Sequence, residues 1–209
     1  MTYITQAISN CRAIAAFHVL RAGLRSPSAS GSGVIISRLP AGQWSNASAV
    51  VVELDLPEDV DVADIVVVLN DQDDLNAISR QAQSPGKALK TEPGPIPESD
   101  TYASHMCKAL GEHTSNFFYA KSKGHLLQLD LRNLEIREAS GENENFYGVP
   151  GVSVGQILSG QVKSPSGASA QLNSTLAALE KQNPSLSGLP KSGNCPGDRR
   201  VRAPRATSS

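Results

Sequence analysis

Short apolar runs separated by turn-forming residues dominate the first part of the chain. Ala13–Leu24 contains a continuous apolar stretch, Val34–Leu39 is rich in β-branched residues, and Trp44–Leu54 continues in the same way. Ile65–Leu69 gives the strongest strand signal in the sequence. We therefore predict four strands here, with the small-residue stretch Ser26–Gly33 as a turn between the first two.

Helical signals are short and lie toward the two ends of the chain. They are a weakly amphipathic segment at Thr2–Asn10, a helix capped by Asn70 or Asp71 and ended by Pro85-Gly86, a helix that begins with a capping box at Ser153 and stops at Gly160, and a helix with Leu172, Leu176 and Leu179 on one face. Thr91–Asp100 is predicted to be a proline-rich loop.

A hairpin is predicted in the second half. Phe117–Tyr119 and Leu126–Ile136 are expected to pair in antiparallel fashion across the turn Lys121–Gly124. Connections such as Pro40–Gly42 are too short for parallel crossovers. The pattern predicts an α+β fold, with a curved, mainly antiparallel sheet or barrel-like core and flanking helices. Trp44, between two strong strands, is predicted to be a buried core anchor.

Charge and composition narrow the function classes. The chain has 209 residues, 19 Lys and Arg against 20 Asp and Glu, and a net charge of -1, which argues against a generic nucleic-acid binder. Glu53–Asp74 holds nine acidic residues and no basic one. The widely spaced Cys11, Cys107 and Cys195 suggest no disulfide framework and favour a reducing compartment. No apolar run is long enough to span a membrane.

The end of the chain differs from the rest in composition. From Ser185 onward, five basic residues stand against Asp198, a net charge of +4, among Ser, Pro and Gly. We expect one domain over 1–183 and a disordered basic tail over 184–209.

Motifs that could carry catalysis or bind metal are weak. Gly31-Ser-Gly33 fits neither a nucleophile elbow nor a dinucleotide loop, and Asn70–Asp74 resembles only half of a calcium loop. His105, Cys107 and His113 match no standard zinc spacing. We expect no catalytic residues, no metal and no cofactor, and interpret the chain as a non-enzyme.

Four basic residues are candidates for binding an anion such as a lipid phosphate. Lys121 and Lys123 flank a tight turn beside three aromatic residues, and Arg21 and Arg25 flank the first predicted strand and its serine-rich turn. The alternative is that the lysines simply form a solvated hairpin tip.

Several segments, in this order, resemble the SYLF domain family. Residues 31–49 read GSGVIISRLPAGQWSNASA, and residues 64–70 read DIVVVLN. They are followed by YAKSKG at 119–124, NFYG at 145–148 and ILSG at 157–160. The resemblance extends over about residues 8–180, and its first motif is long and specific.

This resemblance implies a cytoplasmic adaptor, peripheral to membranes or at cortical actin sites. Its implied partners are an anionic phosphoinositide membrane surface, actin filaments and actin-nucleation factors, with no nucleic acid. Family members carry a basic amphipathic helix upstream, of which we expect Thr2–Asn10 to be a truncated remnant. Where relatives are glycine-rich, this chain has the acidic Glu53–Asp61, and acids there would repel anionic lipid. A module that binds only proteins is therefore the alternative function, and an unrecognised enzyme is the third.

Overall fold

One curved sheet forms the body of the protein. The computed structural model describes residue 8 and residues 11–23, 26–80, 88–94, 116–127, 131–165 and 168–181. The strands are β1 (Ala13–Arg21), β2 (Ser28–Ser37), β3 (Ser48–Asp55), β4 (Val62–Leu69), β5 (Thr91–Pro93), β6 (Asn116–Ser122), β7 (His125–Leu127) and β8 (Arg132–Glu138). The described helices are α2 (Gln72–Ser79), α4 (Ser140–Tyr147), α5 (Val154–Leu158) and α6 (Ala168–Lys181).

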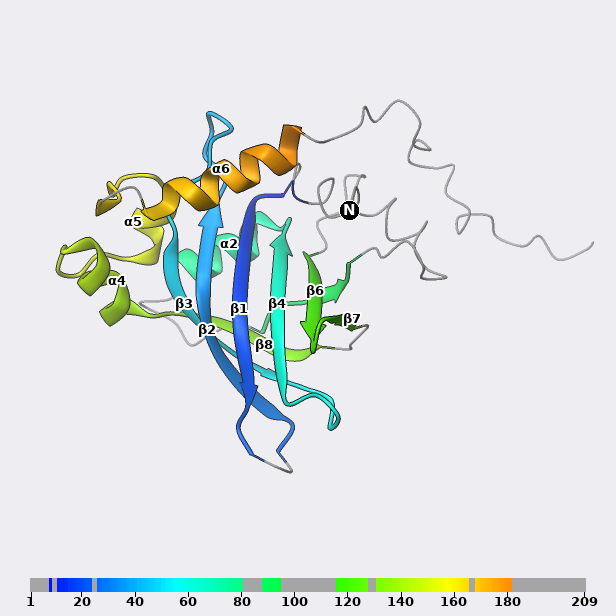
Figure 1. The fold of residues 1–209 in the computed structure, drawn as a ribbon. Helices are drawn as coiled ribbons and strands as arrows, with labels where there is room; N and C mark the ends of the chain where they lie inside the picture. Colours follow the sequence, from blue (N-terminus) through cyan, green and yellow to red (C-terminus); the bar gives the residue numbers. More distant parts are fainter. Residues whose placement is uncertain are drawn as a thin grey trace, which may run out of the picture.

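The strand order makes the sheet almost entirely antiparallel. It runs β5-β6-β4-β1-β2-β3-β8, with β7 also paired to β6, and only β5 and β6 are parallel. The sheet curls into half a barrel, with α2 behind it and α6 across the upper part of its outer face (Figure 1). The predicted α+β class with a curved, mainly antiparallel sheet is confirmed.

The inner face of the curl holds the larger core. Along β1, Ala13, Ala15, Phe17 and Val19 are buried, whereas Ala16, His18 and Leu20 are exposed, as the two-residue period of a strand requires. Side chains from two helices close the curl from inside, namely Leu75 and Ile78 of α2 and Val154 and Leu158 of α5.

A second, smaller core lies on the outer face beneath α6. Leu176 of α6 packs in one cluster with Ile14, Phe117 and Trp44, and Trp44 is only 8% exposed. The predictions of a buried Trp44 and of a last amphipathic helix are therefore confirmed.

The segment 88–94 bridges the two edges of the sheet. The Leu89 amide donates to the Leu134 carbonyl of β8 at 2.7 Å, and the next residues form β5 against β6. The predicted proline-rich loop therefore includes a short strand, and this strand lies where the half-barrel would otherwise stay open. The remainder of Thr91–Asp100 beyond Gly94 lies outside the described residues.

Strand β2 begins earlier than predicted. Ser28–Gly33 belongs to the strand, not to a turn, and every residue of β2 from Ala29 to Ser37 is in register with β1. A Cβ atom at Gly31 would overlap the His18 carbonyl, and one at Gly33 would overlap the Ala16 carbonyl. The glycines therefore allow close backbone approach in the sheet.

The predicted pairing of Leu126–Ile136 with Phe117–Tyr119 is only partly right. β7 pairs with β6 over three residues, but β8 lies at the opposite edge and pairs with β3. Leu134 and Ile136 of β8 are buried in the inner core, and that burial explains why the chain crosses to the other edge. Similarly, β3 begins at Ser48, and Trp44 makes only an isolated bridge with Arg38.

Helices α2 and α5 begin where the capping signals predicted. The Asp71 side chain accepts from the Asp73 amide at the start of α2, and Ser153 and Gln156 form the predicted capping box of α5. α2 ends at Ser79, before the predicted stop at Pro85-Gly86. Of Thr2–Asn10 only the buried Ile8 is described, and the tail 184–209 lies outside the described residues.

Candidate functional site

The β6–β7 hairpin presents two lysines at the lower end of the sheet. Ser122 and His125 are register partners, so Lys123 and Gly124 form a two-residue loop. Both have positive φ angles, 48° and 86°, as a type I′ turn requires. The turn is therefore shorter than the predicted Lys121–Gly124, and Lys121 belongs to strand β6.

Aromatic residues hold this hairpin in place. Phe117, Phe118 and Tyr119 are all less than 8% exposed, with Phe118 in the inner core and the other two in the outer core. Lys121 and Lys123 are exposed. The aromatics are therefore buried and both lysine side chains exposed, and a role of these lysines in binding stays a prediction.

The charges around the lysines are mixed. Lys121 is the register partner of Asp64 on β4, and Asp64 accepts a 2.7 Å hydrogen bond from, or ion-pairs with, His18 Nδ1. The nearby β3–β4 connection carries the exposed Glu58 and Asp59. A ligand at the hairpin tip therefore meets two ammonium groups with carboxylates beside them.

Arg137, another exposed basic residue of the sheet, has its charge paired. Arg137 of β8 contacts Glu135 at 2.9 Å and Glu53 at 3.3 Å. The hydrogen bond from Arg137 lowers the pKa of the Glu135 carboxyl and raises the pKa of the guanidinium. Arg137 is therefore less available to an external anion than the hairpin lysines.

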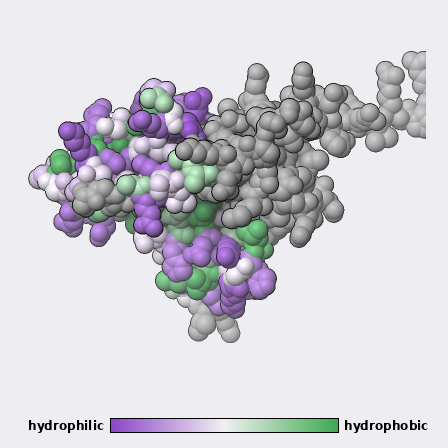
Figure 2. Space-filling view, turned by 45° about the horizontal axis from the view of Figure 1, so that its top comes forward, coloured by the Kyte–Doolittle hydropathy of each residue, from purple (hydrophilic) through white to green (hydrophobic). Residues whose placement is uncertain are grey.

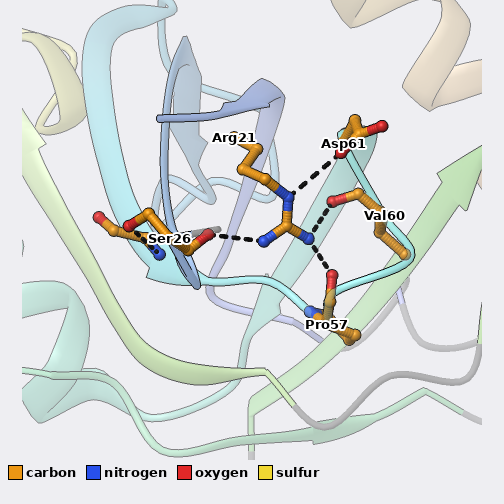
Figure 3. A network of polar contacts seen from close by, with 6 residues as sticks. Arg21, Ser26, Pro57, Val60 and Asp61 are labelled. Atoms are coloured by element: carbon orange, nitrogen blue, oxygen red, sulfur yellow. Dashed lines mark hydrogen bonds and ion pairs between the residues drawn. The ribbon is translucent and has the colours of Figure 1, made fainter. Parts of the chain in front are cut away.

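Arg21 is occupied by the protein itself (Figure 3). Its side chain is 5% exposed and donates to the carbonyls of Ser26, Pro57 and Val60 and to the Asp61 carboxylate. It joins the β1–β2 and β3–β4 connections. This role speaks against Arg21 as a lipid contact, because its donors are already used; Arg25 lies outside the described residues.

The weak motifs have structural explanations where the structure describes them. Asp71 caps α2, and the buried Asp74 accepts from Asn116 Nδ2 at 2.7 Å. Among the described residues, no three His, Cys, Asp or Glu side chains are grouped as metal ligands would be. His105, Cys107 and His113 lie outside the described residues.

Sequence reasoning missed one exposed apolar feature. Phe146 at the end of α4 and Val149 just after it are 48% and 44% exposed. The only sequence signal was the motif NFYG at 145–148, because α4 itself has no apolar stripe.

Comparisons with known proteins point to one family. Residues 59–179 match the model of the family described as "Ysc84: Las17-binding protein actin regulator". Protein YSC84 of Saccharomyces cerevisiae is 30% identical over 76% of this chain and 34% of its own length. LAS seventeen-binding protein 3 of the same yeast is 28% identical over 76% of this chain and 35% of its own length.

A vertebrate protein is similar to the same extent. SH3 domain-containing YSC84-like protein 1 of Xenopus laevis is 26% identical over 76% of this chain and 47% of its own length. The chain thus spans about a third to a half of the length of these relatives. No solved structure matches. None of the described helices is long and apolar enough to cross a membrane.

Proposed function

Because this chain belongs to the Ysc84 family of Las17-binding actin regulators, whose SYLF motifs it carries, we propose that it is a non-enzymatic adaptor between actin regulation and anionic membrane. In this role the domain contacts phosphoinositide-containing membrane through Lys121 and Lys123. It works in the cytoplasm at cortical actin sites, such as those of endocytosis. Its protein partners are actin filaments and actin-nucleation factors.

The single observation that supports the membrane part is the pair of exposed lysines on the β6–β7 hairpin, with Lys121 in strand β6 and Lys123 in the turn. Each basic group near an anionic surface contributes about 1 kcal/mol, screened within a Debye length. Two lysines therefore supply about 2 kcal/mol, and Asp64, Glu58 and Asp59 reduce that attraction. The contact is weak and sensitive to salt.

The names of the family and of one relative support the actin part. The matched family is described as Las17-binding and actin-regulating, and one yeast relative is named LAS seventeen-binding protein 3. Binding to an actin-nucleation factor is therefore the protein–protein activity that we propose for this chain.

A module that binds only proteins is the second candidate. The exposed Glu58 and Asp59 beside the hairpin favour it, because acidic side chains repel an anionic bilayer but can pair with basic groups on a protein.

Vesicle co-sedimentation separates the two. The full chain is pelleted with phosphatidylcholine vesicles that contain or lack a phosphoinositide, at low and at high salt. We expect pelleting only with the phosphoinositide at low salt, and its loss in the double variant Lys121→Ala, Lys123→Ala.

A double variant of two exposed lysines away from the hairpin, Lys90→Ala with Lys163→Ala, is the matched control. It removes the same charge and should pellet like the wild type. If both double variants lose pelleting equally, the attraction depends on net charge and not on the hairpin. If the wild type does not pellet at all, only the protein-binding function remains.

A further inference from the structure

The end of α4 and the loop after it expose two apolar side chains. Phe146 and Val149 are 48% and 44% exposed, and they lie three positions apart at the end of a helix that protrudes from the side of the sheet (Figure 1). We call Phe146 and Val149, with Asn145 and Pro150 beside them, the α4 ledge.

Two buried side chains of α4 hold the α4 ledge in place. Tyr147 is buried and donates its hydroxyl to the Ala47 carbonyl at 2.5 Å. Its ring meets that of Phe146 edge-on, with centroids 5.0 Å apart. Asn143, 1% exposed, accepts from the Ala49 amide at 2.7 Å and donates to Ser48. α4 is thus tied both to β3, through Asn143, and to the β2–β3 connection, through Tyr147.

The loop that follows α4 is held in place as well. Gly148 ends α4 in the left-handed conformation, with a φ of 64°. The Glu144 carboxylate accepts from the Gly151 amide at 3.0 Å, which closes the loop over Val149 and Pro150. A surface held in this way loses little conformational freedom on binding.

The fold accounts for only part of the motif NFYG. Tyr147 anchors the helix and Gly148 ends it, whereas the Asn145 and Phe146 side chains are exposed. An exposed phenylalanine on a rigid support is the kind of residue that dominates binding energy at protein interfaces.

The charged residues near the α4 ledge in the sequence favour a basic partner. Between Glu138 and Val162 the sequence has three glutamates and no lysine, arginine or histidine. Glu138 and Glu144 accept backbone hydrogen bonds, and Glu142 is exposed. An anionic bilayer would be repelled here, whereas a cationic segment is attracted.

We propose that the α4 ledge is a docking site for a basic protein segment that carries an apolar side chain. The apolar side chain packs on Phe146 and Val149, and the basic residues lie over Glu142. The proposal rests on the proposed adaptor role only in expecting a protein partner, and it places that partner away from the hairpin lysines.

Selection from a library of short random peptides tests this on the full chain. We expect the wild type to enrich peptides with a net positive charge around an apolar residue. A synthetic peptide of the enriched sequence should bind Phe146→Ser about tenfold or more weakly, the loss that one aromatic anchor commonly causes. Glu142→Gln should weaken peptide binding less than Phe146→Ser does. Its effect should be larger at low salt than at high salt.

Leu20→Ser is the matched control, since Leu20 is 52% exposed on the outer sheet face. Its replacement should leave peptide binding unchanged. Thermal unfolding of each variant checks that the fold is kept. Enrichment of acidic peptides, or binding that survives Phe146→Ser, would overturn the proposal.

Two further outcomes would also overturn it. If Phe146→Ser reduces vesicle pelleting instead, the ledge contacts membrane; if it converts a dimer to a monomer in sedimentation velocity, the ledge binds a second copy. Vesicle binding through Lys121 and Lys123 is measured separately, so failure of this proposal leaves the proposed membrane function intact.

Discussion

Trp44 shows how one residue joins separate parts of the chain. Its ring lies in the outer core with Ile14 and Leu176, and the Arg38 guanidinium stacks 4.3 Å from its centroid. Trp44 precedes strand β3 and lies in the connection between β2 and β3. Its contacts therefore hold that connection against α6. Its burial was predictable because a large aromatic residue stands between two apolar strands.

Replacing Trp44 should therefore destabilise the whole domain. We expect Trp44→Ala to lower the free energy of unfolding by about 3–5 kcal/mol, through lost apolar contact and the cavity left behind. Trp44→Phe should cost clearly less. Urea unfolding followed by circular dichroism measures both, because Trp44 is the only tryptophan and neither variant keeps its fluorescence. In the wild-type protein, the fluorescence of Trp44 reports whether its ring is buried. Native emission that is red-shifted and readily quenched by iodide would contradict the burial.

Basic residues illustrate where sequence reasoning succeeds and where it stops. Lys121 and Lys123 were predictable as exposed, because they flank a glycine turn next to buried aromatics. Arg21 looked equivalent from its position. Nothing local shows that its guanidinium meets the carbonyls of Pro57 and Val60, more than 30 positions away, since that contact depends on the pairing of β1 with β4.

At the scale of elements, Arg21 holds two connections together. Arg21→Ala leaves the carbonyls of Ser26, Pro57 and Val60 without their charged donor, which should cost about 1–3 kcal/mol. Arg137→Ala, which breaks only exposed ion pairs, should cost much less, because water screens exposed charges. Urea midpoints compare the two. If Arg21→Ala keeps its midpoint but loses vesicle binding, Arg21 is a lipid contact after all.

The anchoring of α4 gives a pH dependence. Burial raises the pKa of the Tyr147 phenol, so the unfolded chain releases this proton at a lower pH than the folded one. The contribution to stability is complete below about pH 10, the usual tyrosine value, and is lost as pH rises above it. Tyr147→Phe removes the hydrogen bond to Ala47, costing about 1 kcal/mol at neutral pH.

The same variant isolates the alkaline effect. Unfolding in urea at neutral and at alkaline pH should show a smaller loss of stability in Tyr147→Phe than in the wild type. An identical pH dependence in both proteins would mean that the Tyr147 hydroxyl is open to water.

Elements were predictable where local signals agreed. β1, β4, α5 and α6 follow from apolar periodicity and capping residues. α4 was not predicted, because SGENENFY has no apolar stripe and the helix is held by Asn143 and Tyr147 reaching to the β2–β3 connection and β3. The place of β8 was missed for a similar reason, since its partner β3 is about 80 positions earlier.

For the whole molecule, the sequence pattern predicted the fold class but not how the two edges of the sheet are joined. Short connections and alternating strands predicted an antiparallel, curved sheet, and the structure has one. The bridge by Leu89 and β5 between the sheet edges depends on contacts distant in sequence. It also positions β6, the strand that carries the lysine hairpin.

The distribution of features over the surface is consistent with an adaptor. In Figure 2 apolar and polar residues are interspersed over the coloured part of the surface. The β6–β7 hairpin lies near one edge of the sheet, and α4 lies beside the opposite edge (Figure 1). If both act as we propose, the domain can bind a membrane and a protein at once.

The most direct measurement of this bridging is recruitment of actin filaments to vesicles. Fluorescent filaments are mixed with phosphoinositide-containing vesicles at low salt, with the full chain, with the Lys121→Ala, Lys123→Ala variant, or with no protein. The account predicts filaments on the vesicles only with the wild-type chain, and loss of that recruitment in the double variant although it still co-sediments with filaments alone. Filament binding by the wild type without any recruitment to vesicles would contradict it.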